Sequence, residues 1–137
     1  MLNGEEMFDF EVNAPLETIS PLTFAYVGDA VHELYVRTML AKDKNLPAAK
    51  LHRAATTFVS ARAQSQTVSA IEGSLSEDEI RIFKRGRNAK SPTAAKNADI
   101  LDYRRATGFE TLLGYLYFKK DFARLEEILK LSYEMHS

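Results

Sequence analysis

The segment from Ser20 to about Ala41 places the strongest constraint on how this chain can fold. Ser20 followed by Pro21 is typical of a helix start, with serine as the N-cap and proline at the first helical position. One side of the helix carries apolar residues at three- and four-residue spacing, namely Phe24, Val27, Val31, Leu34 and Tyr35. The far side is also rich in apolar residues, including Leu22, Tyr26 and Leu40. A helix that is apolar all round is buried on more than one face, so we expect a central helix or one that contacts a second subunit.

The rest of the chain predicts further helices, over about residues 47–71, 76–86, 98–118 and 121–135. Gly73 ends the first of these, and Ser76 with Glu79 forms a capping box at the start of the next. No stretch shows the sustained two-residue alternation of a half-buried strand. We therefore predict an all-α helical bundle, folded as a single domain over residues 1–137, with an irregular N-terminal segment over 1–15.

Composition excludes several classes of protein. The chain has no cysteine, which removes disulfides, thiolate metal sites and a cysteine nucleophile. Hydrophobic residues make up 45% and charged residues 27%, as in ordinary globular proteins. No apolar run approaches the roughly 20 residues of a membrane span, and the acidic N-terminus lacks the basic start of a signal peptide. We expect a cytoplasmic protein without a membrane partner.

Two acidic residues stand out because apolar sequence surrounds them. Asp29 lies inside the first helix, and Glu110 precedes the apolar run 111–118, each with a glycine nearby. Carboxylates that meet on packed helices repel one another unless a cation lies between them. Mg²⁺ is the natural candidate, because it prefers oxygen ligands and assists phosphodiester chemistry. The alternative is that each acid pairs with a nearby base, Asp29 with Arg37 or His32 and Glu110 with Arg104 or Arg105.

The net charge of −1 hides one strongly basic segment. Between residues 81 and 105 only Asp99 and Asp102 oppose the bases Arg81, Lys84, Arg85, Arg87, Lys90, Lys96, Arg104 and Arg105. Such a segment can bind a polyanion locally even in a protein of near-zero total charge. The alternative is a solvated, charged loop.

Two motifs resemble the ribonuclease III family. Residues 22–31, LTFAYVGDAV, resemble the signature helix of ribonuclease III catalytic domains, and residues 109–117, FETLLGYLY, resemble their second acidic motif, in the expected order. Residues 51–61 look like the intervening helix. Residues 85–90, RGRNAK, and Tyr103-Arg104 are similar to the compact bacterial Mini-ribonuclease III branch, which lacks the double-stranded-RNA-binding domain.

The resemblance implies an all-helical homodimer that cuts double-stranded RNA with Mg²⁺, leaving 5′-phosphate and 3′-hydroxyl ends. Asp29 and Glu110 match the family's essential acids, which are catalytic and bind the metal. Larger relatives carry further acids where this chain has Ala25 and Thr107, and Glu33 and Asp99 are candidate substitutes that could equally be surface acids. Family analogy also suggests the precursor of large-subunit (23S) ribosomal RNA as substrate and leaves any accessory ribosomal protein unspecified.

RNA binding is expected to fall to the catalytic domain itself, because the chain ends at Ser137 without room for a separate RNA-binding domain. Duplex RNA is recognised mainly by shape and through its phosphates. We predict that a polar loop after Gly86 supplies these contacts through Arg85, Arg87, Asn88, Lys90 and Lys96, with hydrogen bonds added by Ser91 and Thr93.

Two other functional hypotheses remain open on sequence alone. The absence of acids at positions 25 and 107 is consistent with a ribonuclease III-like fold kept as a non-catalytic RNA-binding or ribosome-associated module. The other is a helical protein-interaction domain. We interpret His32 as a structural histidine, and Tyr115 and Tyr117 as core or dimer contacts rather than stacking platforms for bases.

Overall fold

The computed structural model describes residues 8–43, 45–90 and 99–137, and over these residues it contains helices and no strand. The α-helices are α1 (Pro21–Asp43), α2 (Ala48–Val59), α3 (Ala61–Ile71), α4 (Glu77–Asn88), α5 (Ile100–Phe118) and α6 (Phe122–His136). Short 3₁₀ turns, η1 (Leu16–Thr18) and η2 (Glu72–Ser74), precede α1 and α4. The all-α prediction is confirmed.

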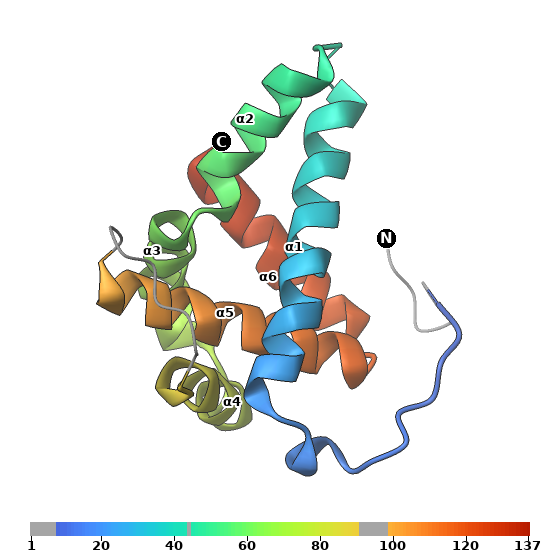
Figure 1. Cartoon of the computed structure of the whole chain (residues 1–137), viewed down its shortest axis with the longest axis vertical. Helices are drawn as coiled ribbons and strands as arrows, with labels where there is room; N and C mark the ends of the chain where they lie inside the picture. The colour runs from blue at the N-terminus through green and yellow to red at the C-terminus, as the bar shows by residue number, and fades with distance from the viewer. Residues whose placement is uncertain (1–7, 44, 91–98) are drawn as a thin grey trace.

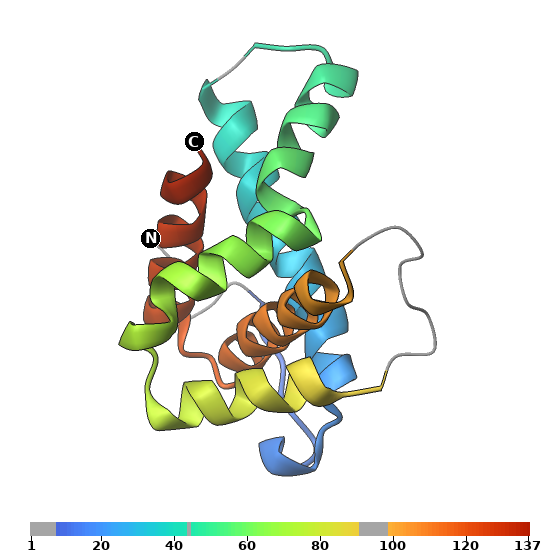
Figure 2. The same cartoon turned by 90° about the vertical axis from the view of Figure 1, so that its left-hand side faces the viewer.

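The helices are arranged around a crossing of α1 and α5 (Figure 1). α3 and α4 pack on α5, and α6 lies against the other side of the crossing. Helix α2 runs beside the C-terminal half of α1, and the two together form an arm that projects from this body (Figure 2). The main core lies at the crossing and includes Phe24, Phe109, Leu112, Leu113 and Leu125, and a smaller cluster of Val36, Leu40, Ala55 and Phe58 joins the arm.

Glycines let α1 and α5 touch through their backbones. A Cβ atom added at Gly28 would overlap the carbonyl oxygen of Glu110, and one added at Gly114 would overlap the carbonyl oxygen of Phe24. A larger residue at either position would therefore force the two helices apart. Because Asp29 follows Gly28 directly, this close contact also fixes the position of Asp29 relative to Glu110.

An ion pair fastens the start of α4 to α6. Ser76 and Glu79 form the predicted capping box. The Glu79 carboxylate also accepts two hydrogen bonds from Arg124, at 2.8 Å from Nε and 2.9 Å from Nη2. Arg124 in addition donates to the carbonyl of Ser74, and its hydrogen bonds lower the pKa of Glu79. One glutamate thus caps α4 and joins it to α6.

The prediction of one continuous helix over residues 47–71 is wrong. The backbone of Ser60 is extended, with φ −63° and ψ 156°, and its hydroxyl accepts a hydrogen bond from the amide of Ala63. Serine favours this arrangement because its side chain satisfies an amide at the start of a helix. The break separates α2 from α3 and allows α3 to pack on α5 while α2 stays beside α1.

The buried face of α1 also differs from the predicted one. Leu34, expected on the apolar face, is exposed, whereas Ala25, Gly28 and His32, which are not part of the predicted apolar face, are buried. Val27, Val31 and Tyr35 lie at the edge of the core as half-buried residues. The reason is the contact with α5: two helices that approach through backbone atoms bury small residues, and the large apolar residues flank the contact.

The glycine contact generates a stability prediction. Gly28→Ala should lower the free energy of unfolding by about 1–3 kcal/mol or more, because the added methyl group meets backbone that cannot rotate away. Gly73→Ala is the matched control, since a Cβ at Gly73 meets no atom within 4 Å. Urea unfolding measures both, and equal stability of the two variants would contradict this account of the crossing.

Candidate active site

Asp29 of α1 and Glu110 of α5 meet at the helix crossing. Their side chains are hydrogen-bonded to one another, and each carboxylate lies in the electrostatic field of the other. Asp29 is exposed and Glu110 is half-buried. The expectation that apolar surroundings enclose Asp29 is therefore wrong, because Asp29 lies on the solvent side of α1 and the burial falls on Glu110.

Burial and the neighbouring acid raise the pKa of Glu110 to about 8. Removal of the carboxylate from water is the largest cause, followed by the charge of Asp29 and the hydrogen bond with it, and Glu33 adds a smaller repulsion. A hydrogen bond from Gln64 opposes these effects. Glu110 therefore keeps its proton to a higher pH than an ordinary glutamate unless a cation is bound beside it.

A buried polar pair stands behind Glu110. Gln64 of α3 donates from Nε2 to Glu110 Oε2 at 3.4 Å, and the same nitrogen lies 2.9 Å from Nδ1 of His32 on α1. Burial, and to a smaller extent the charge of His136, lower the pKa of His32 to about 4, so its ring is neutral. His32 is buried, as predicted for a structural histidine, and it contacts Gln64.

Sequence reasoning missed Gln64. The signal was available in the sequence, because Gln64 stands four residues before Val68 and seven before Ile71 and so falls on the same face of any helix that contains all three. A glutamine on a buried face requires a polar partner, and the structure provides two.

The other acids considered from sequence have different partners. Glu33 forms an ion pair with Arg37 at 3.0 Å. Asp99 is the N-cap of α5 and accepts hydrogen bonds from the amides of Leu101 and Asp102. At the positions where larger relatives carry acids, Ala25 is buried in the core and the hydroxyl of Thr107 donates to the carbonyl of Tyr103.

Arginines do not neutralise the two carboxylates. Arg37 is paired with Glu33, and Arg105 donates to Ser65 and Ser69. Over residues 8–43, 45–90 and 99–137, neither Asp29 nor Glu110 forms an ion pair with a basic side chain. The negative charge of the pair is therefore available to a cation.

The chemistry of the pair fits Mg²⁺. Both donors are carboxylate oxygens, and a raised carboxyl pKa marks a place where a positive charge is favourable. Within the described part of the chain no group of three or more histidine, cysteine, aspartate or glutamate side chains could hold a metal. Asp29 and Glu110 would therefore be the protein's acidic ligands, and the remaining positions suit water or phosphate oxygens, which Mg²⁺ commonly keeps.

The basic residues that precede residue 91 lie mainly in a helix, which corrects the loop assignment. Arg85, Arg87 and Asn88 form the last turn of α4, which extends past Gly86. Arg85 donates to the carbonyl of Ile19. Arg87 lies over the ring of Phe83 and donates to Asn88. Asn88 and Lys90 are exposed, whereas Lys96, together with Ser91 and Thr93, lies outside the described residues.

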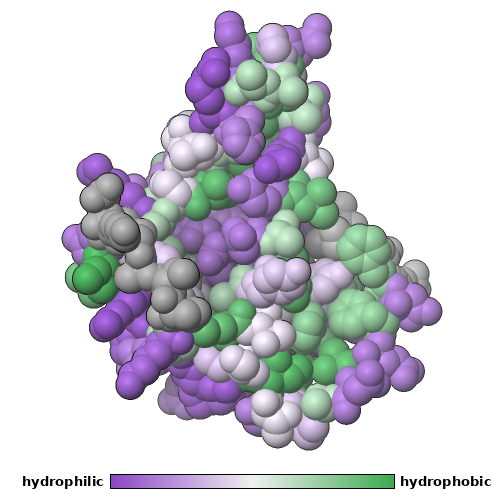
Figure 3. Space-filling view, in the orientation of Figure 1, coloured by the Kyte–Doolittle hydropathy of each residue, from purple (hydrophilic) through white to green (hydrophobic). Residues whose placement is uncertain are grey.

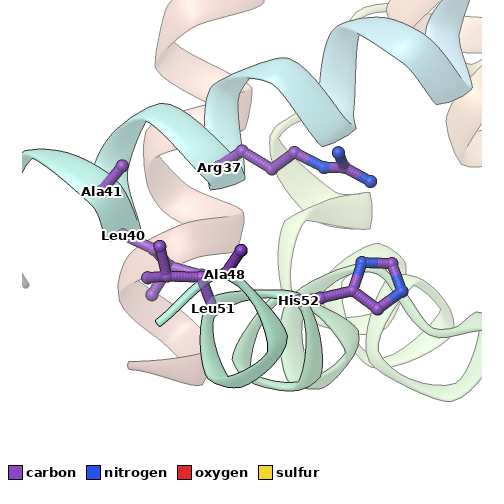
Figure 4. A pocket seen from close by; sticks show the side chains of 6 residues that line it. All are labelled: Arg37, Leu40, Ala41, Ala48, Leu51 and His52. Carbon is purple, nitrogen blue, oxygen red and sulfur yellow. The ribbon is translucent and has the colours of Figure 1, made fainter. Parts of the chain in front are cut away.

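The surface offers two hollows near α1. Figure 3 shows hydrophilic surface in the recess between α1 and α3, above α5. The second hollow, of about 330 Å³, lies in the arm between α1 and α2 (Figure 4) and is lined by Arg37, Leu40, Ala41, Ala48, Leu51 and His52. Neither Asp29 nor Glu110 lines this second hollow, which separates it from the carboxylate pair.

Comparison with known proteins identifies the family. The model of the ribonuclease III domain matches residues 22–121, which include both carboxylates. The chain belongs to the ribonuclease III family. It is 53% identical over 117 residues to the Mini-ribonuclease 3 of Clostridium tetani. The matched region covers 85% of this chain and 78% of that protein. It is 48% identical over 118 residues to the Mini-ribonuclease 3 of a Thermoanaerobacter species, covering 86% and 83%.

The fold comparison agrees with this assignment. An X-ray crystal structure of a Fusobacterium nucleatum protein superimposes with a TM-score of 0.80 at 25% sequence identity and covers 89% of this chain and 98% of that one. As a member of the ribonuclease III family, the chain is an endoribonuclease of the type that acts on double-stranded RNA. No helix among the described residues is long and apolar enough to cross a membrane.

The raised pKa of Glu110 generates a pH prediction for the metal-free ribonuclease. Between about pH 4.5 and 8 the unfolded chain has lost the Glu110 proton while the folded protein keeps it, so the free energy of unfolding should fall as pH rises. Each unit by which the pKa of Glu110 is higher in the folded protein than in the unfolded chain corresponds to roughly 1.4 kcal/mol of the free energy of unfolding. Glu110→Gln should remove this slope and should be more stable than the native protein at pH 8.

Urea unfolding in EDTA across this pH range is the measurement. Glu72→Gln, which changes an exposed glutamate, is the control. Parallel pH profiles for the native protein and Glu110→Gln would show that Glu110 is ionised in the metal-free protein and would contradict the prediction.

Proposed function

We propose that the ribonuclease hydrolyses duplex RNA at the Asp29–Glu110 pair with Mg²⁺ as cofactor. The observation that carries this proposal is the meeting of two carboxylates, Asp29 and Glu110, where burial and then the neighbouring charge of Asp29 raise the pKa of Glu110 to about 8. Asp29 and Glu110 together would hold a divalent cation, whose positive charge would offset the repulsion between them. The alternative of a non-catalytic module does not account for this arrangement, because a metal-free carboxylate pair is electrostatically unfavourable.

The two acids have different tasks in this mechanism. Glu110, half-buried and held from behind by Gln64, is a fixed ligand. Asp29, on the exposed side of α1, faces the solvent from which RNA approaches. When bound, Mg²⁺ stabilises negative charge on the phosphodiester and lowers the pKa of a water molecule. Hydrolysis leaves a 5′-phosphate and a 3′-hydroxyl.

RNA contacts are proposed at the C-terminal end of α4 and the segment after it, through Arg85, Arg87, Asn88, Lys90 and Lys96. Support comes from the exposure of Asn88 and Lys90 and from the absence of any ion pair to Arg85 or Arg87 among the described residues. Phosphate contacts of this kind suit duplex RNA, which is recognised by its shape.

A homodimer is proposed to present two such sites to one duplex. Support comes from the exposed face of α1, where Tyr26 is 82% exposed and Leu34 is 47% exposed on the same side of the helix as Ala30. Exposed apolar residues at four-residue spacing are typical of a helix that packs against a partner. Tyr26, Ala30 and Leu34 lie on α1 close to Asp29, so a second subunit packed on them would border the site.

For the cellular role we propose maturation of the 23S ribosomal RNA precursor in the cytoplasm, by analogy with the family. The whole chain is proposed to act as one catalytic domain.

Replacement of one carboxylate tests the proposed chemistry. Asp29→Asn keeps the shape of the side chain and removes its charge, so cleavage of long duplex RNA in Mg²⁺ should fall by at least roughly 10²–10³-fold, the usual effect of losing one critical electrostatic contact. The fold and duplex binding should persist, because Asp29 is exposed. Cleavage is measured by gel electrophoresis in Mg²⁺, and duplex binding is measured by gel shift in EDTA.

Asp99→Asn is the matched control, because asparagine still caps α5 and the charge change is the same. Full cleavage by Asp29→Asn would refute the assignment. Native protein that binds the duplex in Mg²⁺ and leaves it intact would favour the non-catalytic alternative.

Charge reversal at the end of α4 tests the proposed RNA surface. Arg87→Glu should weaken duplex binding and reduce the slope of log K against log salt by about 0.9 for each phosphate that the variant no longer neutralises. Lys130→Glu, an exposed lysine on α6, is the control with the same charge change. An unchanged salt slope in Arg87→Glu, measured by fluorescence anisotropy, would remove Arg87 from the binding surface.

A further inference from the structure

Gln64 occupies an unusual position for an uncharged polar residue. It is 1% exposed, and its amide lies among α1, α3 and α5, where it contacts one side chain from each neighbouring helix. The amide nitrogen donates to Glu110 Oε2 on one side and lies against His32 Nδ1 on the other. An amide buried this deeply is held by its hydrogen-bond partners and has one preferred orientation.

His32 and Glu110 both contact the nitrogen end of the Gln64 amide. The imidazole is 1% exposed and neutral, and its ring packs edge-on against Phe109, the residue before Glu110. With Nδ1 as the acceptor, the ring proton lies on Nε2, a buried atom without a hydrogen-bond partner among the described residues. His32 thus presents a lone pair to Gln64, and the amide turns its NH₂ group towards both His32 and the carboxylate.

We propose that Gln64 is a positioning residue, which holds the Glu110 carboxylate in the orientation that lets it share a divalent cation with Asp29, and that His32 fixes Gln64 for this task. The proposal rests on the cation of the proposed function. Gln64 is not a catalytic residue, because it acts through Glu110. The general reason is that ligands oriented by a second hydrogen bond bind metals more tightly than ligands free to rotate.

The competing explanation is structural: Gln64 and His32 satisfy one another in the core and have no effect on the ion. The two explanations differ in a measurable way. A structural role affects stability alone, whereas a positioning role affects ion affinity even when packing is intact.

Ion binding without RNA tests the positioning role. Gln64→Met keeps an unbranched side chain of similar length and removes the donor, and Gln66→Met makes the same change at an exposed position of the same helix. In Mn²⁺ titrations followed by calorimetry, Gln64→Met should bind the ion about 10- to 100-fold more weakly than native protein. Gln66→Met should bind as the native protein does. Turnover of duplex RNA at subsaturating Mn²⁺ should fall for Gln64→Met, with its KM for RNA unchanged.

A double variant separates positioning from packing. Gln64→Met alone leaves His32 Nδ1 buried without a partner and should lower the melting temperature. Combining it with His32→Leu removes both polar groups and should recover much of that loss. The positioning role requires the double variant to stay weak in Mn²⁺ binding despite its recovered stability.

The outcomes distinguish the two proposals. Native protein that binds no Mn²⁺ and cuts no duplex would overturn both the proposed cofactor and the role of Gln64. Native protein that binds and cuts, together with Gln64→Met of equal ion affinity, would overturn the role of Gln64 alone. If the double variant recovers native ion affinity together with its stability, the role of Gln64 alone would likewise be overturned.

Discussion

The rest of the site depends on the backbone contact between α1 and α5. Gly28 rests on the carbonyl of Glu110, and Gly114 rests on the carbonyl of Phe24, so the two helices approach more closely than side chains would allow. The residue after Gly28 is Asp29, and the carbonyl that Gly28 touches belongs to Glu110. The same contact that closes the core therefore brings two negative side chains together, and the electrostatic cost of doing so is what makes the place suitable for a cation.

The two acids are not equivalent, and the difference follows from the sides of the helices that they occupy. Asp29 projects from α1 towards solvent, whereas Glu110 is enclosed by α1 and α3. The enclosed acid is the one with a buried hydrogen-bond partner behind it, in Gln64. Under the proposed function, Glu110 would be the more firmly held ligand and Asp29 the more accessible one, an arrangement that suits a site that must hold an ion and admit a large polyanion at once.

Much of this could be predicted from sequence. The helix class follows from caps and apolar spacing, as Ser76 with Glu79 illustrates, and the pairing of Asp29 with Glu110 follows from two motifs with adjacent glycines. The break at Ser60 could not, because a serine inside an apolar pattern is compatible with either a helix interior or an N-cap until tertiary packing decides.

Two further features of the fold were hard to foresee for other reasons. Gln64 lies on the same helix face as Val68 and Ile71, but an uncharged polar residue among apolar ones carries no sign of its partners. The small residues of α1 concealed which side of that helix is buried, since apolar spacing alone pointed to the side that carries Leu34. The end of α4 was placed too early for a simpler reason: Arg87 and Asn88 continue a helix past Gly86, which packs closely against Gly108 of α5 and does not end the helix.

The position of a bound ion tests the central claim most directly. Crystals of the protein soaked in Mn²⁺ and measured at the manganese absorption edge should show an anomalous difference peak within coordinating distance of oxygens from both Asp29 and Glu110. A peak bound to only one of the two acids, or no peak at the helix crossing at saturating Mn²⁺, would contradict the account.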